Sequence, residues 1–96
     1  MKKLTIDGAF IESREALHDL LARELQFPLW YGKNLDALAD CLGDVTEETV
    51  IEINGGDLLC ETLGGYAKAF FRVLSDAAEN NPSLRIVFDG EKGGKI

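Results

Sequence analysis

Strand-forming residues occur in three short runs that lie far apart along the chain. Residues 3–6, 49–53 and 84–88 are rich in β-branched side chains, and the segments between them repeat apolar residues at helical spacing. Strands that alternate with helices are typical of an α/β fold with a small, mainly parallel sheet. The pattern therefore predicts three strands with helices between them.

Two helices are expected before the second strand. The first, over about residues 14–26, follows the candidate N-cap Ser13 and ends before Pro28. The second follows Asn34, a favoured capping residue, and ends at Gly43, the usual residue for a left-handed C-terminal cap. The expected buried stripes are Leu17, Leu20, Leu21 and Leu25 in the first helix and Leu35, Leu38 and Leu42 in the second.

Two more helices are expected before the third strand. The stretch GGDLLCETLGG predicts a brief helix capped by Asp57, and YAKAFFRVLSDAAENN predicts a longer one. One domain over residues 1–89 accounts for the pattern, and the glycine-rich residues 90–96 are expected to form a flexible tail. The residues expected to turn inward from the longer helix are Phe70, Val73, Leu74 and Ala77.

Acidic side chains outnumber basic ones, 17 against 10, for a formal net charge of −7. A surface of that sign repels phosphate backbones, so direct nucleic-acid binding is disfavoured and a basic protein partner is favoured. The N-terminus has Thr5, Asp7 and Gly8 where a signal peptide needs an unbroken apolar stretch, and the sequence contains no run of about 18 apolar residues. We therefore expect a cytoplasmic protein that does not enter a membrane.

Cysteine and histidine are too few for a structural zinc site, which needs about four ligands. Cys41 and Cys60 do not form a CxxC pair, and His18 is the only histidine. Two reduced thiols are expected, with no metal and no cofactor.

The second predicted helix carries Asp36 and Asp40 four residues apart, with Asp44 just beyond its end. At about 100° per residue from Leu35, the two carboxylates lie near 100° and 140°, so they share one face. Asp40 lies in the last turn, where the helix dipole disfavours an anion, and the i, i+4 pair adds repulsion. Acidic residues at positions where they lower the stability of the helix are candidates for a functional role.

Several interpretations of these acids remain open. They are solvated surface residues, or a carboxylate pair for acid and base catalysis, as in retaining glycosidases, whose carboxyl groups are about 5 Å apart. A calcium site is a weaker alternative, because the loop spacing of a calcium hand is missing. The last interpretation is an interface in which the acids, with Trp30 and Tyr31 beside them, meet a basic pocket on another protein.

The stretch YGKNLDALADCL, residues 31–42, resembles the barstar family, intracellular inhibitors of the secreted bacterial ribonuclease barnase. The similarity runs from Lys3 to about Asp89. It implies an α/β fold with a three-stranded parallel sheet packed against about four helices, and inhibition by occlusion rather than by any enzymatic reaction. Supporting matches outside the stretch are Leu17, His18, Leu20, Glu24, Leu25, Pro28, Val73, Asp76 and Ala77.

The resemblance also implies which residues contact the partner, a basic barnase-like ribonuclease bound one to one. Asp40 would occupy the place of a substrate phosphate in the nuclease active site, Asp36 would pair with an arginine or lysine, and Asp76 would contact another basic side chain. Further aromatic, packing and backbone contacts would come from Trp30, Tyr31, Asn34, Leu35 and Gly43.

Several positions depart from the family pattern, among them Trp30, which replaces a tyrosine. Ala39 replaces a large aromatic residue, and Asp44 falls where the family has a tryptophan. These departures keep open a second hypothesis, a barstar-fold interaction or immunity module for a different basic partner or toxin. His18 matches the family but lies away from the acidic face, so a structural or merely exposed residue is expected there.

Overall fold

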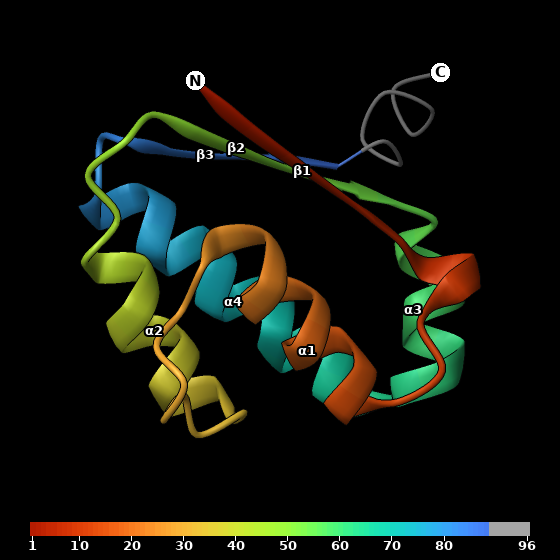
Figure 1. The fold of residues 1–96 in the computed structure, drawn as a ribbon. Helices are drawn as coiled ribbons and strands as arrows, with labels where there is room; N and C mark the ends of the chain where they lie inside the picture. The colour runs from red at the N-terminus through yellow and green to blue at the C-terminus, as the bar shows by residue number, and fades with distance from the viewer. Residues whose placement is uncertain (89–96) are drawn as a thin grey trace, which may run out of the picture.

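The computed structural model describes residues 1–88, and the predicted tail at residues 90–96 lies outside the described part. Within it, four α-helices and a three-stranded parallel sheet confirm the predicted fold class (Figure 1). None of these helices is long and apolar enough to cross a membrane. The elements in chain order are β1 (Lys2–Asp7), the short 3-10 helix η1 (Gly8–Phe10), α1 (Arg14–Leu25), α2 (Leu35–Gly43), β2 (Thr49–Asn54), α3 (Gly56–Leu63), α4 (Gly65–Asn80) and β3 (Leu84–Phe88).

The sheet has the strand order β1-β2-β3, and the helices lie on one side of it (Figure 1). Side chains of the central strand, β2, alternate between the two faces of the sheet. Ile51 and Ile53 are fully buried. Glu52, between them, accepts a hydrogen bond from the Thr5 hydroxyl at 3.3 Å and pairs with Lys3 at 3.6 Å. The sheet therefore has one apolar face toward the helices and one polar face.

The hydrophobic core lies between the sheet and the helices. α2 contributes Leu38 and Leu42, which have no exposed surface, and α2 packs against α4. Of the residues predicted to turn inward from α4, Phe70 and Leu74 are buried, and Val73 and Ala77 are partly buried against the core. The buried apolar residues are Leu4, Ile6, Ile11, Leu17, Leu21, Tyr31, Leu38, Leu42, Ile51, Ile53, Leu59, Ala67, Phe70, Leu74 and Leu84.

The predicted N-caps of α1 and α2 are confirmed. The Ser13 hydroxyl accepts a hydrogen bond from the Ala16 N–H at 3.1 Å, and the Asn34 side-chain oxygen accepts one from the Ala37 N–H at 2.8 Å. Each bond satisfies a backbone donor that has no partner within the helix. The capping residues therefore fix where both helices begin.

Two other predicted caps are wrong. Gly43 is the last helical residue of α2, and the cap is Asp44 in a right-handed conformation, whose N–H returns to the Cys41 carbonyl at 3.2 Å. The N-cap of α3 is Gly55, which has a left-handed conformation with φ of 67°. The helix begins at the next residue, so Asp57 is too late in the chain to cap it. Asp57 instead lies in the first turn of α3, where the helix dipole stabilises its negative charge.

Gly8 lies where η1 passes the start of α3. A Cβ atom at this position would lie 2.1 Å from the Gly55 carbonyl oxygen and 2.9 Å from the Leu59 amide nitrogen. Both are backbone atoms, so no side chain can rotate away to make room. The approach of η1 to α3 therefore requires glycine.

Gly8→Ala is expected to lower the free energy of unfolding by about 2 kcal/mol or more, because the two backbones must separate. Urea denaturation followed by circular dichroism measures the change. Gly65→Ala is the matched control: a Cβ there meets nothing within 4 Å, so stability is expected to stay the same or rise. A Gly8→Ala variant as stable as the original protein would contradict the close approach.

Candidate functional site

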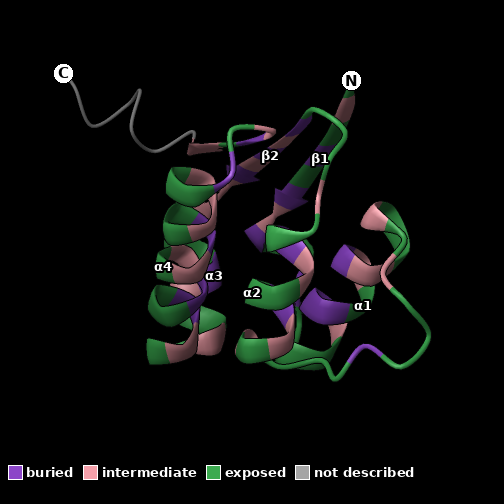
Figure 2. Ribbon diagram, turned by 90° about the vertical axis from the view of Figure 1, so that its left-hand side faces the viewer, coloured by how far each residue is buried: buried purple, intermediate pink, exposed green. Residues whose placement is uncertain are grey.

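The helix that carries Asp36 and Asp40 is fixed at its start and along its inner side. Asn34 caps its first turn, and Leu38 and Leu42 are buried beneath it. In Figure 2, α2 lies between α1 and α4 with an exposed outer side. Both aspartates are exposed. The fold therefore presents the carboxylate pair to solvent on a helix anchored in the core.

Four exposed acids in this region have no cationic partner in the described part of the chain. Ion pairs form elsewhere in residues 1–88, and none of them includes Asp36, Asp40, Asp44 or Asp76. We call these four residues the acidic surface; three come from α2 and its end, and Asp76 comes from the neighbouring α4. Because no basic side chain of residues 1–88 pairs with them, they are available to cations of another molecule.

Cys41 lies close to this negative charge. Burial raises the pKa of its thiol, and the carboxylates of Asp44 and Asp40 raise it further. Cys41 and Cys60 are both free thiols, as predicted. A raised pKa keeps the Cys41 thiol protonated near neutral pH, so a reactive thiolate is disfavoured.

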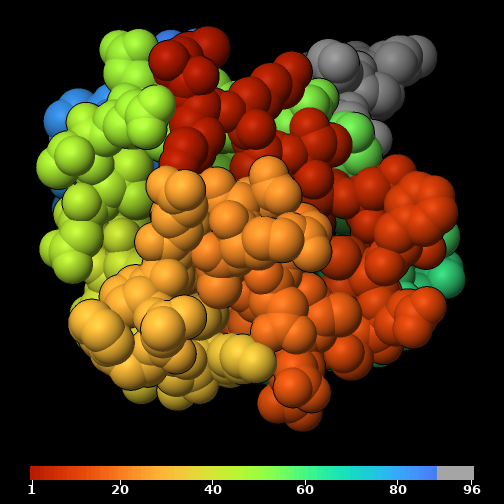
Figure 3. Space-filling model, viewed as in Figure 1, coloured from red at the N-terminus to blue at the C-terminus, as the bar shows by residue number. Residues whose placement is uncertain are grey.

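The loop between α1 and α2 exposes one aromatic residue and buries the other. Trp30 is 84% exposed, whereas Tyr31 is only 8% exposed and packs its ring 4.9 Å from that of Phe27. Figure 3 shows this gold segment beside the yellow-green α2. Leu29 is also fully exposed. Trp30 is therefore the aromatic residue available beside the acids, and Tyr31 offers little surface to a partner.

Tyr31 is held by the buried His18. The Nδ1 atom of His18 lies 2.6 Å from the Tyr31 hydroxyl, and Nε2 lies 2.7 Å from the Tyr66 hydroxyl. A neutral imidazole donates from one nitrogen and accepts at the other, so both ring nitrogens are satisfied. Burial lowers the pKa of His18. The predicted structural role is thus confirmed, and the exposed alternative is wrong because His18 has no exposed surface.

A surface ion pair holds the end of the same loop against α1. The Lys33 ammonium lies 2.9 Å from an Asp19 carboxylate oxygen and 3.9 Å from one of Glu15. The hydrogen bond to Asp19 raises the pKa of Lys33. The loop is therefore attached at two places, by Tyr31 inside the protein and by Lys33 at the surface.

Most residues predicted to contact a partner lie at the surface. Leu35 is half-buried and Tyr31 is buried, as described above. The exposed ones are Trp30, Asn34, Asp36, Ala39, Asp40, Gly43, Asp44 and Asp76. The structure brings Ala39, Gly43 and Asp76 together around a groove between α2 and α4. Leu29 was not among the predicted contact residues. In the sequence, only its position between Pro28 and Trp30 indicates that it lies in the exposed loop.

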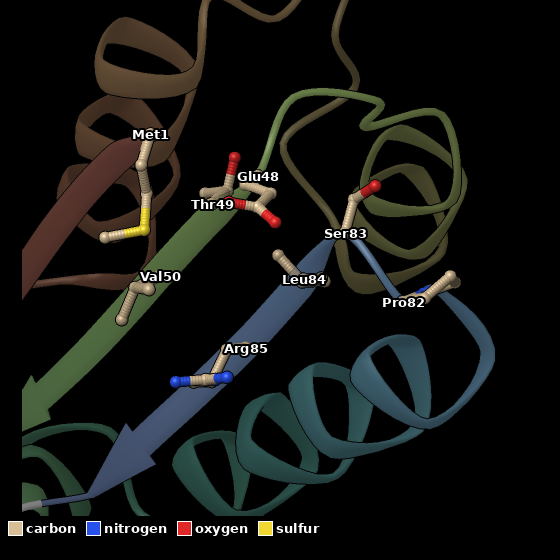
Figure 4. Close-up of a pocket in the computed structure, with 8 residues that line it drawn as sticks. All are labelled: Met1, Glu48, Thr49, Val50, Pro82, Ser83, Leu84 and Arg85. Atoms are coloured by element: carbon tan, nitrogen blue, oxygen red, sulfur yellow. The ribbon is translucent and has the colours of Figure 1, made fainter.

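The carboxylate pair lies outside the hollows that the described part of the chain contains. Neither Asp36 nor Asp40 lines any of the five hollows described in residues 1–88. One of these hollows, about 120 Å³, lies at the amino ends of the strands among residues such as Met1, Thr49 and Arg85 (Figure 4). Within the same residues, no three His, Cys, Asp or Glu side chains gather as metal ligands would. Both carboxylates are exposed and accessible to cations of another molecule.

The exposed carboxylates of α2 are complementary in charge to a basic surface of another protein. Residues 1–89 match the family described as Barstar (barnase inhibitor). The chain is also 41% identical over 80 residues to "Putative ribonuclease inhibitor YrdF" of Bacillus subtilis (strain 168), an alignment that covers 82% of this chain and 88% of that protein. The chain therefore belongs to the barstar family, as the resemblance of residues 31–42 predicted, and this membership supports a role as a ribonuclease inhibitor.

Burial of His18 is expected to make stability depend on pH. Because the pKa of folded His18 is held below its ordinary value of 6.5, the unfolded chain takes up a proton more readily than the folded one. The Asp19 carboxylate opposes this shift, and the Lys33 ammonium adds to it. The contribution of neutral His18 is complete above pH 6.5 and is lost as pH falls from there through the lowered pKa.

NMR titration of the His18 ring protons measures that pKa, and a midpoint below 6.5 is expected. The urea midpoint should fall over the same pH interval. In His18→Gln, which removes the titrating group, this part of the pH dependence should vanish. A His18 pKa at or above 6.5 would contradict the effect of burial.

Proposed function

We propose that this protein is a stoichiometric, one-to-one inhibitor of a barnase-like ribonuclease and acts by blocking the nuclease active site with α2. The observation that carries the proposal is the acidic surface, four exposed carboxylates without a cationic partner in residues 1–88. A site that binds RNA presents cations to phosphates, so its charge is complementary to this surface. Membership of the barstar family supplies the class of the partner.

Asp40 is the central contact in this proposal. It occupies the place of a substrate phosphate, hydrogen-bonded by arginines and a histidine of the nuclease, while Asp36 pairs with an arginine or lysine. Two carboxylates four residues apart mimic consecutive phosphates, and their repulsion is relieved when guanidinium groups arrive. Because Leu38 and Leu42 already fix α2 in the core, binding orders little additional backbone.

The aromatic loop and α4 extend the contact on either side of α2. Trp30 stacks on the catalytic histidine or forms a wall of the pocket, and Leu29 adds apolar area next to it. Asp76 meets another basic side chain. Packing and backbone contacts come from Asn34, Leu35, Gly43 and the neighbouring positions Ala39 and Asp44, with Tyr31 holding the loop from inside.

The proposed inhibitor performs no reaction and needs no cofactor, because occupation of the nuclease site is sufficient. Its place of action is the cytoplasm, where it neutralises nuclease that has not yet been secreted. The exposed position of Asp36 and Asp40, outside any of the described hollows, supports binding over catalysis.

A second candidate is binding of a different basic partner or toxin through the same surface. Ala39 and Asp44 favour it, because they replace aromatic residues that the family uses for contact, and loss of aromatic area changes which partner fits. A pull-down with the protein as bait distinguishes the two candidates. Recovery of a basic non-nuclease protein that is lost with Asp40→Ala bait would favour the second.

Asp40→Ala is expected to raise the inhibition constant against a barnase-type ribonuclease at least about 100-fold, because partner cations desolvated at the interface lose their counter-charge. Asp57→Ala is the matched control, since Asp57 is an exposed acid on α3 outside the acidic surface. Its inhibition constant should change less than about twofold.

The same variants separate binding from folding. Asp40→Ala should unfold at the same or a slightly higher temperature than the original protein, because it removes an unfavourable i, i+4 carboxylate pair. Inhibition by the original protein should weaken as salt is added. Undiminished inhibition by folded Asp40→Ala would contradict the proposed role of Asp40.

A further inference from the structure

One side of the β1 backbone has no neighbouring strand within residues 1–88, because β1 lies at the edge of the sheet. The Lys2 N–H donates to the Glu48 carbonyl at 2.8 Å, so the backbone of Lys2 faces β2. The N–H and C=O groups of successive residues in a strand point to opposite sides. Those of Lys3, Thr5 and Asp7 therefore face away from β2, at the free edge.

A hollow of about 490 Å³ lies between this edge and α1. That volume is within the range of about 300–1,000 Å³ that binding sites occupy. In Figure 3, β1 (red) lies at the surface above α1 (orange). The hollow is lined by two residues of the free edge, by two residues after β1 and by one stripe of α1: Thr5, Asp7, Phe10, Ile11, Ala16, Asp19, Leu20 and Arg23. We call the free edge of β1 and this hollow the edge site.

Apolar surface at the edge site is exposed to solvent. Phe10 lines the hollow and is 78% exposed. Ile11 is buried and Leu20 is half-buried, so the apolar surface continues from Phe10 into the hollow. Aromatic residues are enriched in protein interfaces. The edge site therefore offers apolar contact area next to unpaired backbone groups.

The free edge carries one charge of each sign. Lys3, Thr5 and Asp7 are alternate residues of β1, so their side chains share one face of the sheet. Lys3 pairs with Glu52 at 3.6 Å and still has 62% of its side chain exposed. The Asp7 carboxylate accepts a hydrogen bond from the Ala9 N–H at 3.0 Å and keeps its charge. A complementary antiparallel strand therefore has a basic residue opposite Asp7 and an acidic residue opposite Lys3.

We propose that the edge site binds an extended segment of another protein, which adds to β1 as an antiparallel strand and places apolar side chains in the hollow. An extended occupant is required because the residues opposite Lys3, Thr5 and Asp7 exchange N–H···O=C bonds with them. The two residues between these positions point toward α1, where Ile11 and Leu20 meet them. The segment therefore has the order basic, apolar, β-branched, apolar, acidic. The edge site shares no residue with the acidic surface, so this contact goes beyond the proposed function.

The first test titrates the isotope-labelled protein with the peptide acetyl-KVTVE-amide, which has this order. Saturable NMR shifts are expected at the amides of Lys3, Thr5 and Asp7, with a Kd of about 1 mM for so short a segment. The charge-reversed peptide acetyl-EVTVK-amide should bind about fivefold more weakly, because antiparallel docking then places like charges opposite each other. No saturable shift at those amides up to about 10 mM peptide, or equal binding of the two peptides, would overturn the proposal.

Two N-methylated peptides separate strand pairing from other contacts. In the proposed arrangement the N–H of the peptide's central threonine donates to the Thr5 carbonyl, whereas the N–H of the valine after it points away from β1. A methyl group on the threonine nitrogen should abolish saturable binding, and one on that valine nitrogen should change the Kd less than about twofold. Equal effects of the two methyl groups would overturn the proposal.

Thr5→Pro tests the same bond from the side of the protein. It removes an N–H at the free edge and no bond to β2, and proline is tolerated at sheet edges, so the variant should fold and lose peptide binding. Thr5→Val is the matched control, because it also loses the hydroxyl bond to Glu52 but keeps the N–H. Unchanged binding by folded Thr5→Pro would overturn the proposal. Thermal unfolding checks the fold, and the N-methylated peptides decide the question if Thr5→Pro does not fold.

A second copy of this chain is the alternative occupant of the free edge. The net charge of −7 on each copy opposes that association, so sedimentation of the protein alone at about 10–500 μM should show a monomer. A dimer that Thr5→Pro abolishes would overturn the proposal. The peptide titrations contain no nuclease, so their outcome and that of the proposed inhibition are independent.

Discussion

The burial of Leu38 and Leu42 is the interaction on which the rest of the site depends. Both side chains are fully buried, and burial of a leucine contributes about 1.5–3 kcal/mol. Repulsion between carboxylates at i and i+4 costs only about 0.2–0.5 kcal/mol. The apolar side of α2 therefore outweighs the unfavourable charges on its outer side. The fold can present Asp36 and Asp40 on a rigid helix at a small cost in stability.

Buried polar contacts extend this rigidity to the loop before α2. His18 connects Tyr31 of the loop to Tyr66 of α4, so one imidazole joins α1, α4 and the segment that carries Trp30. A buried histidine with both nitrogens satisfied costs far less than one left without partners. The exposed Trp30 thus lies directly next to backbone that Tyr31 holds in place, which reduces the conformational entropy lost on binding.

Much of the fold could be predicted because the signals for it are local. The strands follow from β-branched runs, and Ser13 and Asn34 cap helices with bonds to residues three positions away. The caps at Gly43 and Asp57 were predicted wrongly, because the backbone conformations of Asp44 and Gly55 decide those helix ends.

The site was only partly predictable because some of its contacts span long distances in the chain. The partners of His18 are 13 and 48 residues away, so neither its burial nor that of Tyr31 follows from spacing. The groove needs Ala39 and Asp76 to come together from two helices. The acids themselves were visible in the sequence because helix periodicity places Asp36 and Asp40 on one face.

The most direct test of the account is to titrate a barnase-type ribonuclease of known concentration with this protein and follow RNA cleavage. The account predicts that activity falls linearly and reaches zero at one inhibitor per nuclease. Full nuclease activity at a micromolar excess of the folded protein would contradict the claim that the acidic helix blocks such an active site.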